Sequence, residues 1–351
     1  MLFGGVEGGA THSTLALFND KAEKLAEVEG LGTNLFQIGM EETCHRIANM
    51  CQDAFKLAGY APDTPLVSLG LSLSGCEVEE TNEALALKMK ELYPALLKTI
   101  PKVCSDTVGS LFTASDKGGV VLIAGTGSNS LLVNPDGSVG RCGGWGHVLG
   151  DEGGAWWIAQ KAMKCWFDDL DGMNKPAFST QRVAEVVKAY FDIQDRFGLL
   201  TYCYDKFDKP HFAGNDYFLF ITKNPLLKAI FFLGLCKDLA KLADQNDDLA
   251  KWIFAEAGRV LAKHIVALSP KMSKSLQESL SVVCIGSVWK SWTHLRPGFT
   301  QELTVSAPQI QSFQLLHLKV PMATGACYLA AGDQMKKNYK ENTQVFYSYP
   351  Q

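Results

Sequence analysis

One short motif occurs twice in this chain and constrains its fold more than any other feature. Residues 9–19 and 124–134 each carry a glycine-containing turn, a threonine, an apolar run and a closing asparagine. Thr11 aligns with Thr126, and the two asparagines align at the same offset. Because chance does not readily reproduce all these features together, we predict an internal duplication with two halves that face each other.

The spacing of apolar residues predicts strands and helices in both halves, and therefore an α/β fold. Two halves of the type βββ-αβα, meeting near Lys117, would place both glycine turns at one cleft. We therefore expect one domain over residues 1–117 and a second, with additional helices, over 118–351. Strands are predicted at 2–7, 13–18, 24–29, 67–72, 101–105, 118–124, 130–133 and 281–285. Helices are predicted at 40–58, 79–92, 107–115 and 152–168, within 180–270, and at 323–336.

Composition argues against several classes of function. The chain has 33 basic and 37 acidic residues, so it has no basic excess to favour nucleic acid as a partner. Its longest apolar stretch, residues 229–236, is far shorter than the ~20 residues that cross a bilayer, and we expect no membrane partner. The first residues lack the features of a secretion signal, and the ten cysteines are scattered without a CxxC pair. We therefore expect a cytoplasmic protein with buried, reduced thiols.

The two glycine turns are candidates for binding phosphate. Gly8 and Gly9 precede Thr11, and the turn at 125–128 repeats the arrangement with Thr126. Glycines leave backbone N–H groups open to a phosphate, and the threonines add hydroxyl donors. Tight turns between strands also need glycine, so a purely structural role stays open. The turns match neither a P-loop nor a dinucleotide fingerprint, because no GxxxxGKS or GxxxxGKT occurs and a strand follows each turn.

Two aspartates and one aromatic loop are further candidates. Asp106 follows a predicted strand and precedes a predicted helix, which fits an N-cap and also a catalytic base. Its carboxylate is ionised at neutral pH and can accept a hydroxyl proton as a phosphoryl group arrives. Asp151 has the same two interpretations. Trp145, set among glycines, suggests an exposed aromatic face of the kind that sugar sites use, whereas His147 fits a structural or a ligand-binding role.

Several motifs together carry a family resemblance. They are GGVEGG (4–9), LGLSLSG (69–75), GTGSN (125–129), GGWGH (143–147), GDEG (150–153), GSVWKSW (286–292) and FYSY (346–349). Over nearly its whole length the sequence resembles the N-acetylglucosamine kinases of the animal type, in the sugar kinase/Hsp70/actin superfamily. The resemblance implies two actin-like (ribonuclease H-like) domains around a deep cleft. It also implies phosphorylation of the 6-hydroxyl of N-acetyl-D-glucosamine by ATP with Mg²⁺, in cytoplasmic amino-sugar salvage by a homodimer.

The resemblance also assigns roles to residues. It implies that Asp106 is the catalytic base and that Glu7 organises Mg²⁺ through water. The implied sugar-binding residues are Asn34, Ser74, Asp106, Ser128, Asn129, Trp145, Gly146, His147 and Asp151. The implied nucleotide-binding residues are Gly8, Gly9, Thr11, Thr126, Gly127, Ala213, Gly286, Ser287, Val288 and Trp292.

The sequence departs from the family pattern at three places. Ala10 stands where a third glycine is common, and His12 stands where a basic side chain is common, so we expect weaker ATP binding. Residues 215–234 resemble an insertion, either an extra helical hairpin or an apolar patch for a partner. This stretch directly follows Ala213 and bears on its assignment.

Two alternative functions stay open at this stage. One is a kinase that prefers another amino sugar, such as N-acetylmannosamine. The other is a non-catalytic sugar or nucleotide sensor on the same fold, against which the presence of Asp106 argues. An activator ATPase with an iron–sulfur cluster would need clustered cysteines, which this sequence lacks.

Overall fold

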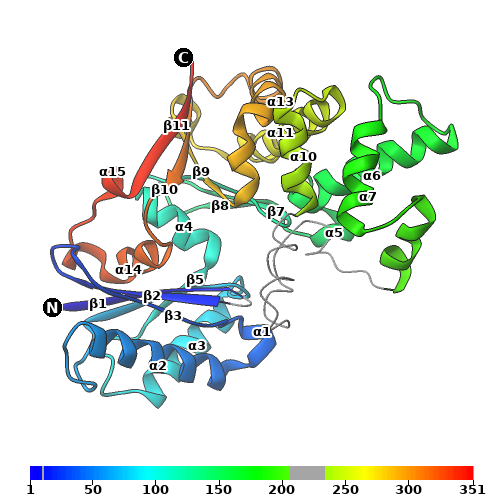
Figure 1. Cartoon of the computed structure of the whole chain (residues 1–351). Helices are drawn as coiled ribbons and strands as arrows, with labels where there is room; N and C mark the ends of the chain where they lie inside the picture. Colours follow the sequence, from blue (N-terminus) through cyan, green and yellow to red (C-terminus); the bar gives the residue numbers. More distant parts are fainter. Residues whose placement is uncertain (10–11, 206–233, 351) are drawn as a thin grey trace.

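Two β-sheets with helices packed on them organise the fold (Figure 1). The computed structural model describes residues 1–9, 12–205 and 234–350. The strand order is β3-β2-β1-β4-β5 in the first sheet and β11-β10-β9-β6-β7-β8 in the second. The predicted insertion at 215–234 lies outside the described residues except for Gly234, and Ala10 lies outside them as well.

The first sheet is built from the amino-terminal part of the chain. Its first three strands form the predicted antiparallel meander, and two further strands join it in parallel. The strands are β1 (Leu2–Gly8), β2 (His12–Asn19), β3 (Lys24–Leu31), β4 (Ser68–Leu73) and β5 (Lys102–Ser105). The helices of this part are α1 (Leu35–Ile38), α2 (Met40–Leu57), α3 (Glu79–Leu92) and α4 (Asp106–Ala114).

In the helix predicted at 40–58, Met40, Cys44, Ile47 and Cys51 recur at helical spacing and predict one apolar stripe. Helix α2 confirms it, with Met40 only half-buried. Cys44, Ile47 and Cys51 are fully buried and join the core formed with the first sheet. Residues three and four apart share one helix face, so this spacing places all three against the strands. Burial of such side chains is the main stabilising contribution to the helix.

The second sheet repeats the topology of the first. Its order from β8 through β7, β6 and β9 to β10 matches the order from β3 to β5, with the same antiparallel and parallel pairs. This agreement supports the predicted duplication, and β11 adds a further antiparallel edge strand. The strands are β6 (Gly119–Ala124), β7 (Ser128–Val133), β8 (Val139–Gly143), β9 (Leu280–Ile285), β10 (Phe313–Leu318) and β11 (Thr343–Tyr349).

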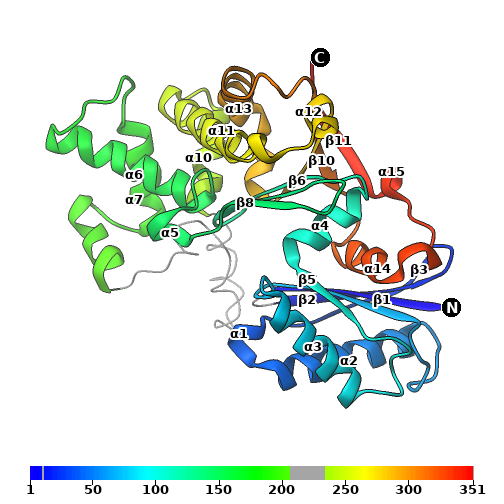
Figure 2. The ribbon, with the colours of Figure 1, turned by 180° about the vertical axis from the view of Figure 1, so that it is seen from behind.

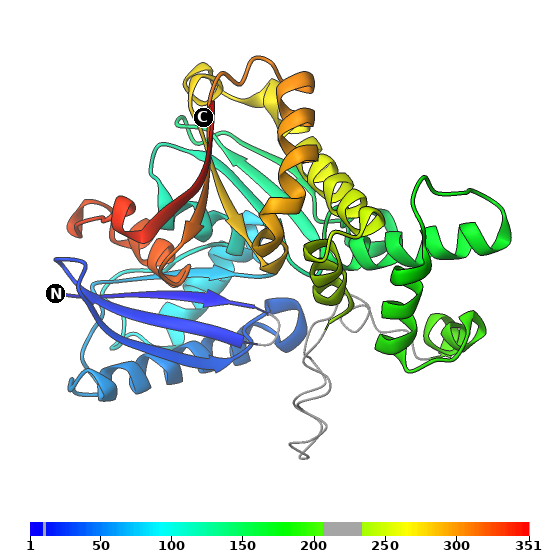
Figure 3. The ribbon, with the colours of Figure 1, turned by 45° about the horizontal axis from the view of Figure 1, so that its top comes forward.

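Helices of the second part form the larger core. Figures 2 and 3 show α11 and α13 side by side, and their backbones approach closely at Gly258. An added Cβ there would lie 2.0 Å from the Leu295 carbonyl oxygen. The helices are α5 (Gly146–Leu149), α6 (Ala155–Asp171), α7 (Gln181–Phe191), α10 (Leu235–Asp244), α11 (Asp248–Leu268), α12 (Lys274–Glu278), α13 (Trp292–Ser306), α14 (Ala323–Ala331) and α15 (Tyr339–Asn342). In the described part of the chain, no helix has the length and apolarity that a membrane crossing requires.

Two helices differ from their predicted bounds by more than two residues. The helix predicted at 323–336 ends at Ala331, because Gly332 has a φ of 56° that breaks the helix. The helix predicted from 152 begins at Ala155, after a tight loop. Strands β8, β10 and β11 were not predicted, because glycine or polar residues interrupt the apolar residues of each.

Each sheet with the helices packed on it forms one lobe of the molecule. Two helices connect the first lobe with the second. Leu111 of α4 packs against Val121 and Val283 of the second sheet. Helix α14, although near the carboxyl end of the chain, packs on the first sheet through Ala323 and Cys327 (Figure 1). The division into residues 1–117 and 118–351 stays a prediction, and α14 crosses it in space.

Helix α14 packs backbone to backbone on the first sheet, and this contact predicts a large effect of one methyl group. An added Cβ at Gly70 of β4 would lie 1.8 Å from the Ala326 carbonyl oxygen. We expect Gly70→Ala to lower the free energy of unfolding by about 3 kcal/mol, because neither backbone can give way cheaply. Urea unfolding measures the change.

Gly140→Ala is the matched control for this strand glycine. The nearest neighbours of an added Cβ at Gly140 in β8 would be side chains, those of Leu268 and Lys271 at 3.3 Å and that of Leu132 at 3.6 Å. We expect a cost below about 1 kcal/mol. Equal costs for the two variants would contradict the proposed role of the α14 contact.

Candidate functional site

A cavity of about 620 Å³ opens between the two lobes and is lined by residues from both. The loops that form it follow β4, β5, β6 and β8. Parallel strands end at one edge of a sheet, which explains why these loops converge there. Predicted site residues that line the cavity are Asn34, Ser74, Asp106, Thr126, Gly127, Ser128, Asn129, Gly146 and Asp151.

Asp106 lies where β5 passes into α4. It is the first residue of the helix, Ser105 occupies the cap position, and no side-chain cap bond forms, so the N-cap interpretation of Asp106 is wrong. Instead the Ser74 hydroxyl donates to Asp106 Oδ2 over 2.7 Å. A carboxylate at a helix N-terminus also gains from the helix dipole. The side chain is therefore held in one orientation at the cavity wall.

Asp151 has a structural role different from the predicted helix cap. Gly154 caps α6, while Asp151 is buried in the preceding loop with a φ of 67°. Its Oδ1 accepts the backbone N–H of Ser128 over 3.0 Å. An added Cβ at Gly127 would lie 2.2 Å from the same oxygen. The aspartate therefore holds the second glycine turn, and it lines the cavity as well.

The surroundings of the glycines differ between the two turns. An added Cβ at Gly8 would lie 1.9 Å from Thr33 Oγ1, and one at Gly9 would lie 3.2 Å from the His12 carbonyl oxygen. At Gly125 an added Cβ would meet nothing within 4 Å, and this residue lines the cavity. Packing thus accounts for Gly8. Gly125 is the sterically open position of the second turn, and its own N–H donates to the Gly127 carbonyl oxygen over 3.0 Å. Thr11 lies outside the described residues.

Glu7, on β1, is a partly buried carboxylate near Asp106. Burial is the main cause that raises its pKa from 4.5 to about 7, and the negative charge of Asp106 raises it further. The backbone N–H of Met322 donates to the carboxylate and lowers the pKa in part. In the described part of the chain, no three His, Cys, Asp or Glu side chains converge as a metal site. A Mg²⁺ ion in this cleft would therefore depend on these two carboxylates together with oxygens of a ligand.

Some of the residues assigned by the resemblance do not line the cavity. Val288 is buried in the core of the second lobe, and Trp292 packs against Trp289. Gly286 has a φ of 108° and lies against the end of β6, beside Gly125. The other predicted residues that do not line the cavity are Glu7, Gly8, Gly9, Trp145, His147 and Ser287, and Ala213 lies outside the described residues.

The loop after β8 contains the two aromatic predictions. Trp145 is 66% exposed, as predicted, and the Arg141 guanidinium lies 5.4 Å from its ring centroid. The His147 ring lies 5.3 Å from that of Trp156. Trp145 is therefore near the cavity without lining it.

Residues that sequence analysis did not assign also line the cavity. They are Phe36, Gly75, Glu77, Ile123, Arg141 and Gly144, and Gly125 of the candidate phosphate turn lines the cavity as well. Gly75, Gly125 and Gly144 lie inside the motifs at 69–75, 125–129 and 143–147. The assigned residues of these motifs could therefore have pointed to them. Arg141 directly precedes the GGWGH motif, whereas Phe36 and Glu77 carry no recognisable pattern.

His264 supports the cavity from α11, where no motif marks it. Its Nδ1 lies 3.0 Å from the Val260 carbonyl oxygen, so we place the ring proton there. Its Nε2 is then an acceptor, 3.4 Å from the Ser128 hydroxyl. Burial lowers the pKa of His264, which keeps the ring neutral at pH 7.

The model of the BadF/BadG/BcrA/BcrD ATPase family matches residues 5–326. The chain belongs to this family. An N-acetylmuramic acid/N-acetylglucosamine kinase of Clostridium acetobutylicum is 24% identical over 215 residues, which are 61% of this chain and 61% of that protein. An N-acetyl-D-glucosamine kinase of Dictyostelium discoideum is 25% identical over 220 residues, which are 58% of this chain and 65% of that protein.

The alignments therefore cover less than two thirds of these curated relatives. One solved structure is similar to the present chain over almost the whole length of both. It is a candidate N-acetylglucosamine kinase from Chromobacterium violaceum, with a TM-score of 0.60 and 23% identity over 93% of this chain and 98% of that chain. This likeness confirms the expected actin-like α/β fold.

The raised pKa of Glu7 predicts a pH-dependent stability. The unfolded carboxyl has a pKa of 4.5 and the folded one about 7, so its burial costs nothing at low pH. The cost appears as the pH rises through this interval and is complete above it. Without Mg²⁺ we expect Glu7→Gln to stabilise the protein by up to about 3 kcal/mol at pH 8 and by less than about 1 kcal/mol at pH 5. Urea unfolding at both values measures this.

Glu29→Gln provides the matched control, because Glu29 is an exposed glutamate on β3 of the same sheet. We expect it to change stability equally at pH 5 and pH 8. A pH-independent effect of Glu7→Gln would mean that the Glu7 carboxyl is not desolvated.

Proposed function

We propose that this protein transfers the γ-phosphoryl group of ATP to the 6-hydroxyl of N-acetyl-D-glucosamine. The observation that carries the proposal is the Ser74–Asp106 pair, which shares one cavity with the open glycine turn at Gly125. A fixed carboxylate beside a sterically open turn would provide a base and room for a phosphate at one place. Membership of an ATPase family and the names of the curated relatives support this assignment.

In the proposed reaction Asp106 accepts the proton of the sugar hydroxyl. Ser74 occupies Oδ2, so we assign Oδ1 as the proton acceptor. The hydroxyl oxygen forms its bond to the γ-phosphorus while the bond from that phosphorus to the β,γ-bridging oxygen breaks, which leaves ADP. Phosphoryl transfer depends on positioning and on charge neutralisation more than on covalent catalysis. Asp106 therefore needs a fixed orientation, which the Ser74 hydroxyl provides.

The proposed sugar site uses the polar side chains of both lobes. Asn34 Oδ1 already accepts the N–H of Phe36 over 3.1 Å, so its Nδ2 is the group that we expect to meet the sugar. Asn129 lines the cavity, and its buried Oδ1 has no hydrogen-bond partner in the described protein. That acceptor suits a donor such as a hydroxyl or an acetamide N–H. Ser128, Gly146 and Asp151 are the further residues we propose for the sugar.

The proposed nucleotide site follows the second glycine turn. Gly125, Thr126 and Gly127 would face the phosphates. Gly286, which Ser287 follows, lies beside Ala124 at the end of β6 and beside Gly125, and we propose both residues for the nucleotide as well. Glu7 would hold Mg²⁺ through water, and the ion would supply charge neutralisation at the phosphates. Thr11 and Ala213 remain part of the proposal by resemblance. We also propose a homodimer that acts in cytoplasmic amino-sugar salvage.

The first test is a coupled ADP-release assay with Mg-ATP and N-acetylglucosamine. We expect sugar-dependent turnover that falls by about 10²–10⁴-fold in Asp106→Asn, because the base is lost. Ser74→Ala should lower kcat by about tenfold with little change in KM, since Asp106 would lose its fixed orientation. Parallel assays with N-acetylmannosamine compare kcat/KM between the two sugars.

Asp53→Asn is the matched control, because Asp53 is an exposed aspartate on α2, outside the cleft. It should retain full activity. Tight sugar binding by calorimetry without turnover would instead support a non-catalytic sensor. Unchanged turnover in Asp106→Asn would reject its role as base.

A further inference from the structure

The first sheet ends in a strand with one open edge. Strand β5 pairs with β4 alone. Within the described chain, no backbone–backbone hydrogen bond outside the helices and sheets involves residues 102–105, and the Ser105 carbonyl oxygen accepts the Ser72 hydroxyl over 3.1 Å. In a parallel pair, alternate residues direct their N–H and C=O groups away from the neighbouring strand. These groups form a template for another strand.

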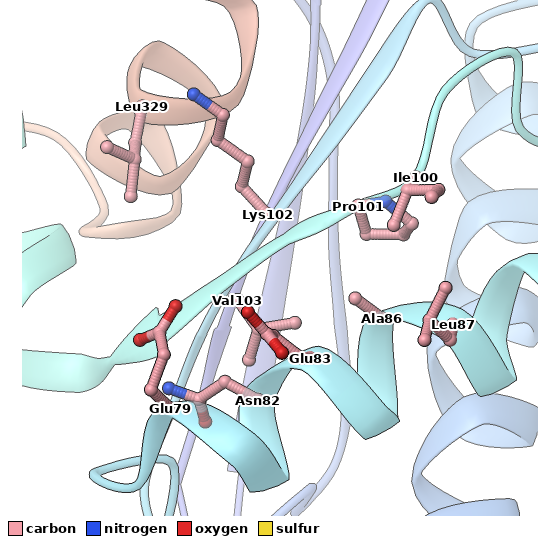
Figure 4. A pocket seen from close by; sticks show the side chains of 10 residues that line it. All are labelled: Glu79, Asn82, Glu83, Ala86, Leu87, Ile100, Pro101, Lys102, Val103 and Leu329. Carbon is pink, nitrogen blue, oxygen red and sulfur yellow. The ribbon is translucent and has the colours of Figure 1, made fainter.

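A groove of about 420 Å³ runs along this edge, between α3 and α14 (Figure 4). One wall is a single face of α3, because its lining residues recur every three or four positions. The residues from that helix are Glu79, Asn82, Glu83, Ala86 and Leu87. The other lining residues are Ile100, Pro101, Lys102 and Val103 at β5 and Leu329 of α14.

The α3 wall has an acidic end and an apolar end, as Figure 4 shows. Glu79 and Glu83 are exposed carboxylates at one end. Between them lies Asn82, whose buried Oδ1 has no hydrogen-bond partner in the described protein. At the other end Leu87 and Ile100 are more than half exposed. This wall therefore suits a segment that carries both positive charge and aliphatic surface.

The two faces of the sheet differ along β5. Val103 packs against the core that lies under α3. Lys102 precedes it, and alternate residues of a strand point to opposite faces. Figure 4 shows Lys102 directed toward Leu329 of α14. A strand added beside β5 would thus place alternate side chains toward the glutamates of α3 and toward Leu329.

We propose that this groove binds an extended segment of a partner protein, which adds a strand to β5. The segment would carry lysine or arginine toward Glu79 and Glu83, and apolar residues toward Leu329. Backbone hydrogen bonds give such complexes affinity, and the alternate side chains give specificity. A second copy of this chain suits the edge less well. Pairing about a two-fold axis perpendicular to the sheet would bring two acidic α3 faces together.

The test uses a synthetic peptide of about seven residues that alternates lysine and valine, with both ends blocked. NMR titration of the full-length protein should shift backbone signals of residues 79–87 and 100–105. Glu83→Lys should weaken binding by about fivefold or more, because attraction becomes repulsion. Glu80→Lys is the matched control, since Glu80 is an exposed glutamate on α3 that does not line the groove. It should change the affinity by less than about twofold.

Two peptide controls separate strand addition from other binding. The same sequence with N-methylated alternate amides cannot pair with β5, and a glutamate–valine peptide carries the wrong charge. Both should bind at least about fivefold more weakly than the lysine peptide. Equal binding by either control, equal binding by free lysine, or shifts confined to other surfaces would overturn the proposal. Absence of binding at millimolar peptide would overturn it as well.

Discussion

The backbone contact between α14 and the first sheet supports much of this structure. Gly5 and Gly70 allow the carbonyl groups of Ala323 and Ala326 to approach the strands at distances that any Cβ would block. On its other side α14 meets α4, where an added Cβ at Gly325 would lie 2.0 Å from the Gly109 carbonyl oxygen. Since protein interiors are close-packed, such contacts fix the position of a helix to a fraction of an ångström.

The candidate site depends on this arrangement. Helix α4 begins with Asp106, and Met322, which directly precedes α14, holds the Glu7 carboxylate through its backbone N–H. The positions of the Asp106 and Glu7 carboxylates therefore both depend on the contact between α4 and α14. The second lobe adds the glycine turn, in which Asp151 accepts the backbone N–H of Ser128. Asp106 and the glycine turn are thus each positioned by a side chain, Ser74 or Asp151, that lines the same cavity.

Prediction from sequence succeeded where the signal was local. The meander at 2–29, the stripe of Cys44, Ile47 and Cys51, and the helix at 79–92 follow from the spacing of apolar residues, and the structure confirms them. Prediction failed where another part of the chain decides. Strand β10 is recognisable only once β9 lies beside it, and β11 only once β10 is in place. The helix at 323 stops at a glycine whose conformation the spacing does not reveal.

The sequence by itself determined the duplicated topology, the glycine turns and the position of Asp106 at the end of a strand. These features are local, because periodicity and turn residues act over a few neighbouring positions. Only the tertiary structure decided that Ser74 orients Asp106, that Asp151 supports a turn and that His264 meets Ser128. It also left Gly125 as the open glycine of the second turn and exposed the edge of β5. These facts depend on contacts between distant segments, which the order of residues along the chain does not specify.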